Sequence, residues 1–138
     1  MPIEYREETP AAAAYHALFE TTGWNNDFRV SVAEVERALA SSWCIVAAYD
    51  GDELVGVGRV LSDGVLHAMI YDVIVHPSHQ NRGIGTEIMR RLVARCHAAG
   101  VRNVQLFAAK GKAPFYEKRG FVARPADRPG MTLQKGQQ

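Results

Sequence analysis

The sequence predicts an α/β protein of the α+β kind, with a mixed central sheet of six to seven strands and about four helices. Three observations lead to this fold class. The composition, 47% hydrophobic and 22% charged, is typical of a globular chain. Apolar residues recur with helical spacing in some segments and form short apolar runs in others. Turn residues separate these segments into the order β-α-α-β-β-β-α-β-α-β-β. A chain of 138 residues is expected to form a single domain over residues 1–138.

The first third of the chain predicts one strand and two helices joined by a loop. An N-cap threonine with proline at the next position begins the first helix, and a capping box begins the second. The loop between them holds two large aromatic side chains. In order, the expected elements are a strand over 3–6, a helix over 11–21, a loop over 23–28 and a helix that starts at Ser31 with Glu34 completing its capping box.

The remaining two thirds predict six strands, one long helix and one short helix. Tight turns rich in aspartate and glycine separate the first three of these strands, and a glycine ends the long helix. The expected strands are 44–49, 54–61, 66–75, 103–107, 121–124 and 131–133, and the expected helices are 83–99 and 113–118.

Several classes of protein are excluded by the absence of their sequence features. No run approaches the roughly 18 apolar residues of a membrane helix, and the N-terminus lacks the apolar segment of a signal peptide. A cytoplasmic protein without a membrane partner is therefore expected. Cys44 and Cys96 show no metal-type spacing and supply no disulfide framework, so we expect no metal and two small buried hydrophobic side chains.

Charge is distributed unevenly, although the net charge is only +1. Residues 1–75 hold 4 basic and 12 acidic side chains, whereas residues 76–119 hold 9 basic and 2 acidic side chains. The basic part suits a polyanionic cofactor. The acidic part suits a cationic acceptor, although chance segregation of solvated charges explains it equally well. No separate block of basic and aromatic residues exists, so nucleic acid is not expected as a partner.

The turn between the strand over 66–75 and the long helix is the most informative segment. Residues 80–86 read Gln-Asn-Arg-Gly-Ile-Gly-Thr. Glycines at a helix start let a ligand approach unpaired backbone N–H groups, and the helix dipole favours an anion there by roughly 0.3–1 kcal/mol. A phosphorylated cofactor is the natural ligand. A Walker loop is excluded because no lysine follows Gly85, and a dinucleotide fingerprint because Ile88 stands where its third glycine belongs.

The pattern Gln-x-x-Gly-x-Gly, with Val-x-Pro before it, resembles the coenzyme A pyrophosphate loop of the GNAT superfamily of acyl-CoA-dependent N-acyltransferases. A second signature of that superfamily, Ala-Pro-Phe-Tyr-Glu-Lys-Arg-Gly-Phe, occupies residues 113–121. The resemblance covers residues 44–133, whereas residues 1–42 match by pattern only. Residues 71–73 and the segment 124–131 are similar to small bacterial and plastid members regarded as acetyltransferases of amines, including arylalkylamines.

This resemblance implies the GNAT fold, with a sheet that splays between its fourth and fifth strands. It also implies acetyl-CoA as co-substrate, no metal, and direct transfer of the acetyl group to a primary amine of a small molecule in a ternary complex. Two alternatives remain: transfer to a protein N-terminus or lysine, and a non-catalytic module that senses acyl-CoA. A homodimer is common among relatives and is possible here.

The resemblance also suggests which residues bind the cofactor and which donate the proton. Relatives carry a tyrosine four residues before the Gly-Phe junction, which gives Tyr116 the role of general acid toward the leaving thiolate. Many relatives have asparagine where this chain has Ala109, which puts one cofactor contact in doubt. The expected cofactor-binding residues are Val73, Ile74, Val75, Gln80, Asn81, Arg82, Gly83, Ile84, Gly85 and Thr86.

The general base and the acceptor site are less well defined by the sequence. His67 and Asp72 are the candidate bases, each with a purely structural role as the alternative. Strand alternation puts His67 and Tyr71 on one face and Asp72 on the other, unless a bulge re-aims one of them. His79 is expected to face solvent. The expected substrate-binding residues are Trp24, Asn26, Phe28 and Tyr71.

Overall fold

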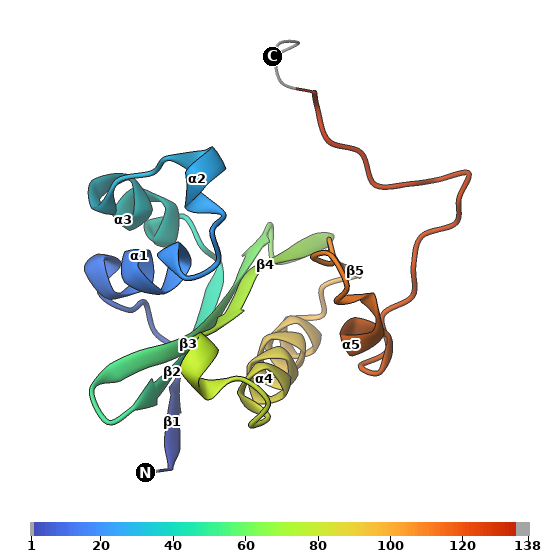
Figure 1. Cartoon of the computed structure of the whole chain (residues 1–138). Helices are drawn as coiled ribbons and strands as arrows, with labels where there is room; N and C mark the ends of the chain where they lie inside the picture. Colours follow the sequence, from blue (N-terminus) through green and yellow to red (C-terminus); the bar gives the residue numbers. More distant parts are fainter. Residues whose placement is uncertain (1, 135–138) are drawn as a thin grey trace. The chain divides into compact units, whose positions relative to one another are not determined.

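The computed structural model describes residues 2–134 and contains five strands, five α-helices and one short 3-10 helix in that range (Figure 1). The chain divides into two compact units, Met1–Gln105 and Leu106–Gln138. In chain order the elements are β1 (Ile3–Arg6), α1 (Ala12–Glu20), α2 (Asn25–Phe28), α3 (Val32–Ala40), β2 (Cys44–Asp50), β3 (Glu53–Ser62), β4 (His67–Val75), the 3-10 helix (Pro77–His79), α4 (Ile84–Ala99), β5 (Asn103–Leu106) and α5 (Ala113–Glu117).

The sheet follows the chain, in the order β1-β2-β3-β4-β5. The pairs β1–β2, β2–β3 and β3–β4 are antiparallel. At the start of β5, the Arg102 and Asn103 amides donate to the carbonyls of Val65 and Leu66 in the same chain direction. The last pair is therefore parallel and the sheet is mixed, as a crossover through α4 requires.

Helices cover both faces of the sheet, with α1 and α3 on one face and α4 on the other (Figure 1). Alternation along the strands separates the two cores, because neighbouring side chains of a strand point to opposite faces. Under α1 and α3 the buried residues are Tyr15, Leu18, Phe19, Val35, Leu39, Ile45, Ala47, Leu54, Val57 and Ile74. The buried face of α4 consists of Ile84, Ile88, Met89, Leu92 and Cys96.

Two glycines of β3 allow α4 to lie close against the sheet. A Cβ added at Gly56 would lie 2.9 Å from Ile84 Cγ2, and one added at Gly58 would lie 2.7 Å from Ile88 Cγ2 and 2.8 Å from Leu92 Cδ1. Real Cβ atoms essentially never approach other heavy atoms so closely. The Val-Gly-Val-Gly stretch of β3 therefore fixes the depth at which α4, and the turn that leads into it, pack.

The helix signals of the sequence are mostly confirmed. Ser31 Oγ accepts from the Glu34 amide at 3.1 Å, and Glu34 Oε1 accepts from the Ser31 amide at 3.0 Å, so the capping box begins α3. Gly100 ends α4 in the left-handed conformation, with φ 73°. The first helix begins later than expected, at Ala12, because Ala11 is extended at ψ 135°.

The predicted count of six to seven strands and about four helices is wrong. Residues 121–124 and 131–133 form no strand in the described part of the chain. Prolines at 125 and 129 remove backbone donors, and the segment instead makes a turn in which the Arg128 amide donates to the Pro125 carbonyl. Val122 and Met131, 88% and 85% exposed, bury no apolar face that would hold a strand.

The fifth helix, α2, forms where a loop was expected. Just before this single turn, Thr22 Oγ1 accepts a hydrogen bond from the Trp24 amide at 3.0 Å. The turn ends at Arg29, which has the left-handed conformation.

The expectation of a single domain over residues 1–138 stays a prediction. No helix among residues 2–134 has the length and apolar character needed to cross a membrane.

Replacing Gly58 with alanine tests the close packing of α4. We expect Gly58→Ala to lower the free energy of unfolding by about 1–3 kcal/mol, the usual cost of overpacking a core, as measured by urea denaturation. In a Leu92→Ala background the same change should cost less, because Leu92 Cδ1 is one of the overlapping atoms. Equal costs in the two backgrounds would contradict this account.

Candidate active site

The turn after β4 is held by backbone and side-chain hydrogen bonds. The His76 amide donates to the Val55 carbonyl of β3 at 2.7 Å, and Gln80 Nε2 donates to the Val75 carbonyl at 3.1 Å. Two residues of the turn, Asn81 and Gly83, have positive φ angles of 64° and 80°. Gln80 and Asn81 thus shape the turn. Gly83 is the N-cap of α4, and no side chain of the described residues caps the helix there.

The start of α4 has the features of an anion site. Amides in the first turn of a helix have no intrahelical partner, and the helix dipole adds partial positive charge there. Arg82 is exposed and makes no ion pair within residues 2–134. Arg90 and Arg91, in contrast, both bind Glu87, with N–O distances of 2.7 and 2.8 Å. The charge available to a ligand at this turn therefore comes from Arg82 and the backbone.

A bulge in β4 re-aims Asp72. Val57 pairs with Ile74 and Arg59 with Tyr71, so β4 holds one more residue than β3 between these pairs. Asp72 lies at this bulge and has a φ of 54°, a left-handed conformation that aspartate tolerates better than most residues. Simple strand alternation had put Asp72 and Tyr71 on opposite faces. With the bulge, both side chains line the same pocket.

Asp72 is held by two side chains from other elements. Its Oδ2 accepts from Arg59 Nε of β3 at 2.7 Å and from the Tyr15 hydroxyl of α1 at 2.8 Å. Both bonds end on the same oxygen, Oδ2, and the other oxygen, Oδ1, accepts no hydrogen bond from the described residues. Burial, with the nearby Asp72 charge, raises the pKa of Tyr15, which keeps this phenol a donor. Sequence reasoning missed Tyr15 and Arg59, although an arginine inside an apolar strand was a usable signal.

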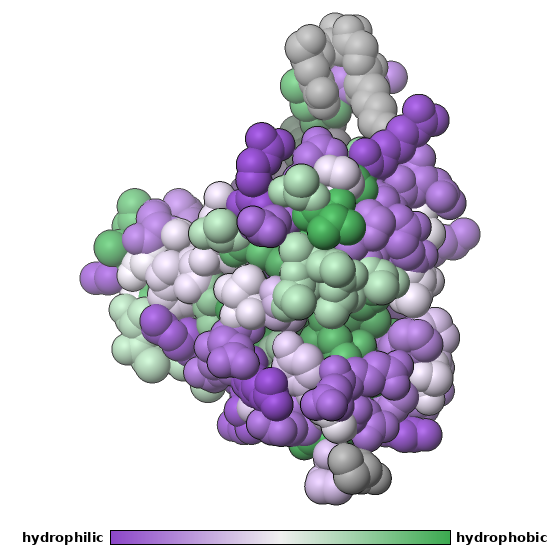
Figure 2. Space-filling view, turned by 90° about the vertical axis from the view of Figure 1, so that its left-hand side faces the viewer, coloured by the Kyte–Doolittle hydropathy of each residue, from purple (hydrophilic) through white to green (hydrophobic). Residues whose placement is uncertain are grey.

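The pocket beside Asp72 has a volume of about 320 Å³. Aromatic and aliphatic side chains form most of its wall, and two carboxylates and one guanidinium add charge. Figure 2 views the side of the molecule that carries α1–α3 and shows hydrophobic side chains at the surface between hydrophilic ones. The lining residues are Tyr15, Phe19, Phe28, Val30, Glu34, Val35, Ala38, Leu39, Arg59, Leu61, Tyr71 and Asp72.

Only part of the predicted substrate set lies in this pocket. Phe28 and Tyr71 line it, whereas Trp24 and Asn26 do not. Trp24 packs against Phe19 instead, with ring centroids 6.0 Å apart. His67 lies at the exposed start of β4 and contacts Asn103 Nδ2 through Nδ1 at 3.2 Å. The structure therefore brings Asp72, but not His67, into the pocket.

β4, the strand that leads into the turn, extends beyond the end of its neighbour β5. β5 begins beside Leu66 and has four residues, whereas β4 has nine and continues to Val75. At about 3.3 Å per residue, β5 ends near the middle of β4. Val73, Ile74 and Val75 follow beyond that point, the place where the resemblance expects backbone groups to bind the pantetheine arm.

Tyr116 lies in the second unit, in the short helix α5. It is half-buried, and its ring meets those of Phe115 and Phe121 at centroid distances of 5.0 and 6.2 Å. Burial raises the pKa of Tyr116, so its phenol stays protonated at neutral pH. Ala109, at the position where many relatives have asparagine, accepts a hydrogen bond from the Lys112 amide through its carbonyl.

His79 does not face solvent, contrary to the expectation. It is 8% exposed, and its Nε2 lies 2.9 Å from Asp50 Oδ2 at the end of β2. A 3-10 turn over Pro77–His79 directs this ring inward, toward the hairpin between β2 and β3. A motif in sequence could not reveal this contact because the partner lies 29 residues away.

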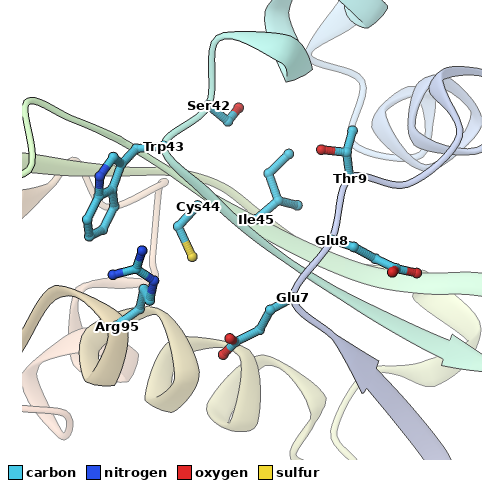
Figure 3. Close-up of a pocket in the computed structure, with 8 residues that line it drawn as sticks. All are labelled: Glu7, Glu8, Thr9, Ser42, Trp43, Cys44, Ile45 and Arg95. Atoms are coloured by element: carbon cyan, nitrogen blue, oxygen red, sulfur yellow. The ribbon is translucent and has the colours of Figure 1, made fainter. Parts of the chain in front are cut away.

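Cys44 is only half-buried, contrary to the expectation, and it lines a second pocket of about 240 Å³ (Figure 3). Cys44 lies between Arg95 and Glu7, and the Arg95 guanidinium stacks 4.6 Å from the Trp43 ring centroid. Burial, followed by the charge of Glu7, raises the pKa of Cys44, and burial raises that of Cys96. Neither thiol is therefore activated as a nucleophile. Within residues 2–134 no group of three or more histidine, cysteine, aspartate or glutamate side chains could hold a metal ion.

Comparison with known proteins now identifies the class. The acetyltransferase (GNAT) family profile matches residues 5–121. A ycf52-like N-acetyltransferase of Prochlorococcus marinus, itself uncharacterized, is 32% identical over 112 residues, which cover 78% of this chain and 61% of that protein. The chloroplastic serotonin N-acetyltransferase 2 of Oryza sativa subsp. japonica is 38% identical over 84 residues, covering 61% of this chain and 42% of that protein. This chain therefore spans less than two thirds of the length of either relative.

Solved structures agree with this result. The crystal structure of a probable acetyltransferase from meticillin-resistant Staphylococcus aureus superposes with a TM-score of 0.82 at 27% identity, covering 96% of this chain and 99% of that one. The chain belongs to the GNAT acetyltransferase family and has the α+β GNAT fold. Members of this family use acetyl-CoA as co-substrate.

The cluster of Asp72, Arg59 and Tyr15 makes a testable contribution to the free energy of unfolding. Asp72→Asn keeps the size of the side chain but leaves the Arg59 guanidinium, 16% exposed, without its counter-charge. We expect a loss of about 1–3 kcal/mol in the free energy of unfolding by urea denaturation. Tyr15→Phe, which removes one neutral donor, should cost about 0.5–1.5 kcal/mol. An Asp72→Asn protein as stable as the wild type would rule out this role for the cluster.

Proposed function

We propose that this protein transfers the acetyl group of acetyl-CoA to the primary amine of a small molecule, by direct transfer in a ternary complex. The observation that carries the proposal is the pocket that reaches Tyr71 and Asp72 on β4, immediately before Val73–Val75. An amine bound there would lie next to the strand that is expected to hold the thioester. The pyrophosphate would bind the turn over residues 80–86, through the backbone and Arg82.

The walls of the pocket favour a cationic acceptor with an apolar, aromatic body. Four aromatic rings, those of Tyr15, Phe19, Phe28 and Tyr71, would pack against such a ligand. The carboxylates of Glu34 and Asp72 would attract its ammonium group. An arylalkylamine combines these features, and one relative is a serotonin N-acetyltransferase. A pocket lined on several sides supports a small acceptor better than an extended peptide.

Three proton transfers accompany the reaction. The acceptor ammonium must lose a proton before its nitrogen attacks the thioester carbon, and Asp72 is the better placed candidate base because it lines the pocket and His67 does not. Attack forms the C–N bond of a tetrahedral intermediate whose nitrogen still carries an extra proton. This proton passes to solvent as the C–S bond breaks and the thiolate of coenzyme A leaves. Tyr116 would protonate this thiolate, since its phenol is protonated at neutral pH. No metal has a part in these steps.

Loss of the Tyr116 hydroxyl tests the enzyme hypothesis. We expect the wild type to release free thiol from acetyl-CoA with one class of amine from a panel of arylalkylamines, polyamines, amino acids and peptides. Tyr116→Phe should lower that rate at least about tenfold, within the usual range for general acid catalysis. Tyr49→Phe, a change in β2 outside the pocket, is the matched control and should leave the rate unchanged.

The possible outcomes separate the hypotheses. Thiol release only with peptides would support the alternative of protein acetylation. Binding of acetyl-CoA without release of thiol for any acceptor would support the sensor instead. A Tyr116→Phe enzyme that works as fast as the wild type would remove Tyr116 from the mechanism but leave acetyl transfer standing.

The aromatic preference has its own test at Phe28. This side chain lines the pocket but is 67% exposed, so its removal should disturb the fold little. We expect Phe28→Ala to raise KM several-fold for an arylalkylamine, on the order of 1 kcal/mol of lost ring contact, and to change KM little for an aliphatic diamine. Equal effects on both amines would argue against recognition of an aromatic ring.

A further inference from the structure

A continuous hydrogen-bond chain runs from the end of β2 into the turn before α4. His79 Nε2 lies 2.9 Å from Asp50 Oδ2, His79 Nδ1 lies 2.7 Å from Ser78 Oγ, and Ser78 Oγ lies 2.7 Å from His76 Nδ1. The two imidazole rings meet edge to face, with centroids 6.3 Å apart. His79 is the one buried polar side chain in the described part of the chain. Neither the fold nor the transfer chemistry described above explains why it is there.

The hydrogen positions in this chain follow from its acceptors. The Ser78 amide donates to His76 Nδ1 at 3.1 Å, so that nitrogen carries no proton. The Ser78 hydroxyl must then donate to His76 Nδ1 as well, because two acceptors would otherwise face each other at 2.7 Å. The Ser78 oxygen is left to accept from His79 Nδ1. Since His79 Nε2 donates to the Asp50 carboxylate, His79 carries a proton on both nitrogens.

The charged groups around His79 agree with a cation at this position. Asp50, at the end of β2, supplies the counter-charge, and the bond from His79 holds the pKa of the Asp50 carboxyl below its ordinary value. Among the residues that the structure describes, the other titratable group in contact with His79 is His76, which accepts hydrogen bonds at Nδ1. Arg82, farther along the turn, acts electrostatically on Asp50 in the same direction as His79.

We propose that His79 is a positioning residue whose doubly protonated ring locks the turn over residues 76–83 in its coenzyme-binding form. Loss of a ring proton removes one bond of the chain, so affinity for coenzyme A falls once the pH is high enough to remove that proton. The sign follows from linkage, because the form that binds coenzyme A holds one more proton. This inference rests on the proposed function only in taking the turn as the coenzyme site.

The direct test is the dissociation constant of coenzyme A, measured by isothermal titration calorimetry from about pH 5.5 to 8.5, across the histidine range. The proteins are the wild type, His79→Gln, Asp50→Asn and, as matched control, His97→Gln, an exposed histidine in the last turn of α4. Phosphate groups of coenzyme A also titrate in this range. Their contribution is common to all four proteins and cancels in the ratio of wild-type to variant affinity.

We expect the wild type to bind more tightly than His79→Gln at low pH and to lose that advantage by about three- to tenfold as the pH rises, the range for one hydrogen bond. Asp50→Asn should flatten the profile in the same way, which keeps the test available if one variant does not fold. His97→Gln should follow the wild type. Profiles of His79→Gln and Asp50→Asn that run parallel to the wild type would overturn the inference.

A second measurement does not depend on the cofactor. Long-range ¹H–¹⁵N spectra of the unliganded wild-type chain report which ring nitrogens carry protons. We expect both nitrogens of His79 to be protonated at about pH 6, and a single ring proton there would overturn the inference. If the wild type binds no coenzyme A at any pH, the proposed function fails instead, and the spectra still decide the protonation of His79.

Discussion

The contact of Asp72 with Arg59 and Tyr15 is the interaction on which the rest of the candidate site depends. It joins α1, β3 and β4 through one carboxylate oxygen. The left-handed backbone at Asp72 would be unfavourable without such support, and the bulge would be free to shift. Because these bonds hold it, Tyr71 and Asp72 both line the pocket under α1 and α3. The residues of β4 that line the pocket are thereby followed directly by the residues of β4 that are expected to hold the thioester.

A second constraint acts on the other face of the sheet. Gly56 and Gly58 lack side chains, so Ile84, Ile88 and Leu92 of α4 can pack directly on β3. The helix start, with its glycine N-cap, is then held at a fixed depth beside the end of β4. The turn between them is tied to β3 through the His76 amide and to β2 through His79. An anion at the helix start would therefore meet amides whose positions are set by the sheet.

Local signals in the sequence predicted most of the elements. The capping box at Ser31, the glycine after α4 and the apolar runs of the strands act through neighbours within a few residues, so they can be recognised without a structure. The same holds for the turn over residues 80–86. Where local signals were weak, the prediction failed. Strands were expected at 121–124 and 131–133 from their apolar residues, but the prolines of this segment are unfavourable for a strand. A loop was expected where α2 forms, because this helix has only one turn.

The sequence by itself determined the family and predicted an anion-binding turn and Tyr116 as the candidate acid, because each of these signals lies in consecutive or regularly spaced residues. Only the tertiary structure decided which side chains share the pocket beside Asp72. Asp72 and Tyr15 are 57 residues apart, and Asp50 and His79 are 29 apart. Such contacts depend on a bulge, a strand register and the packing of helices on the sheet. These features arise from interactions between distant segments, and no local pattern encodes them.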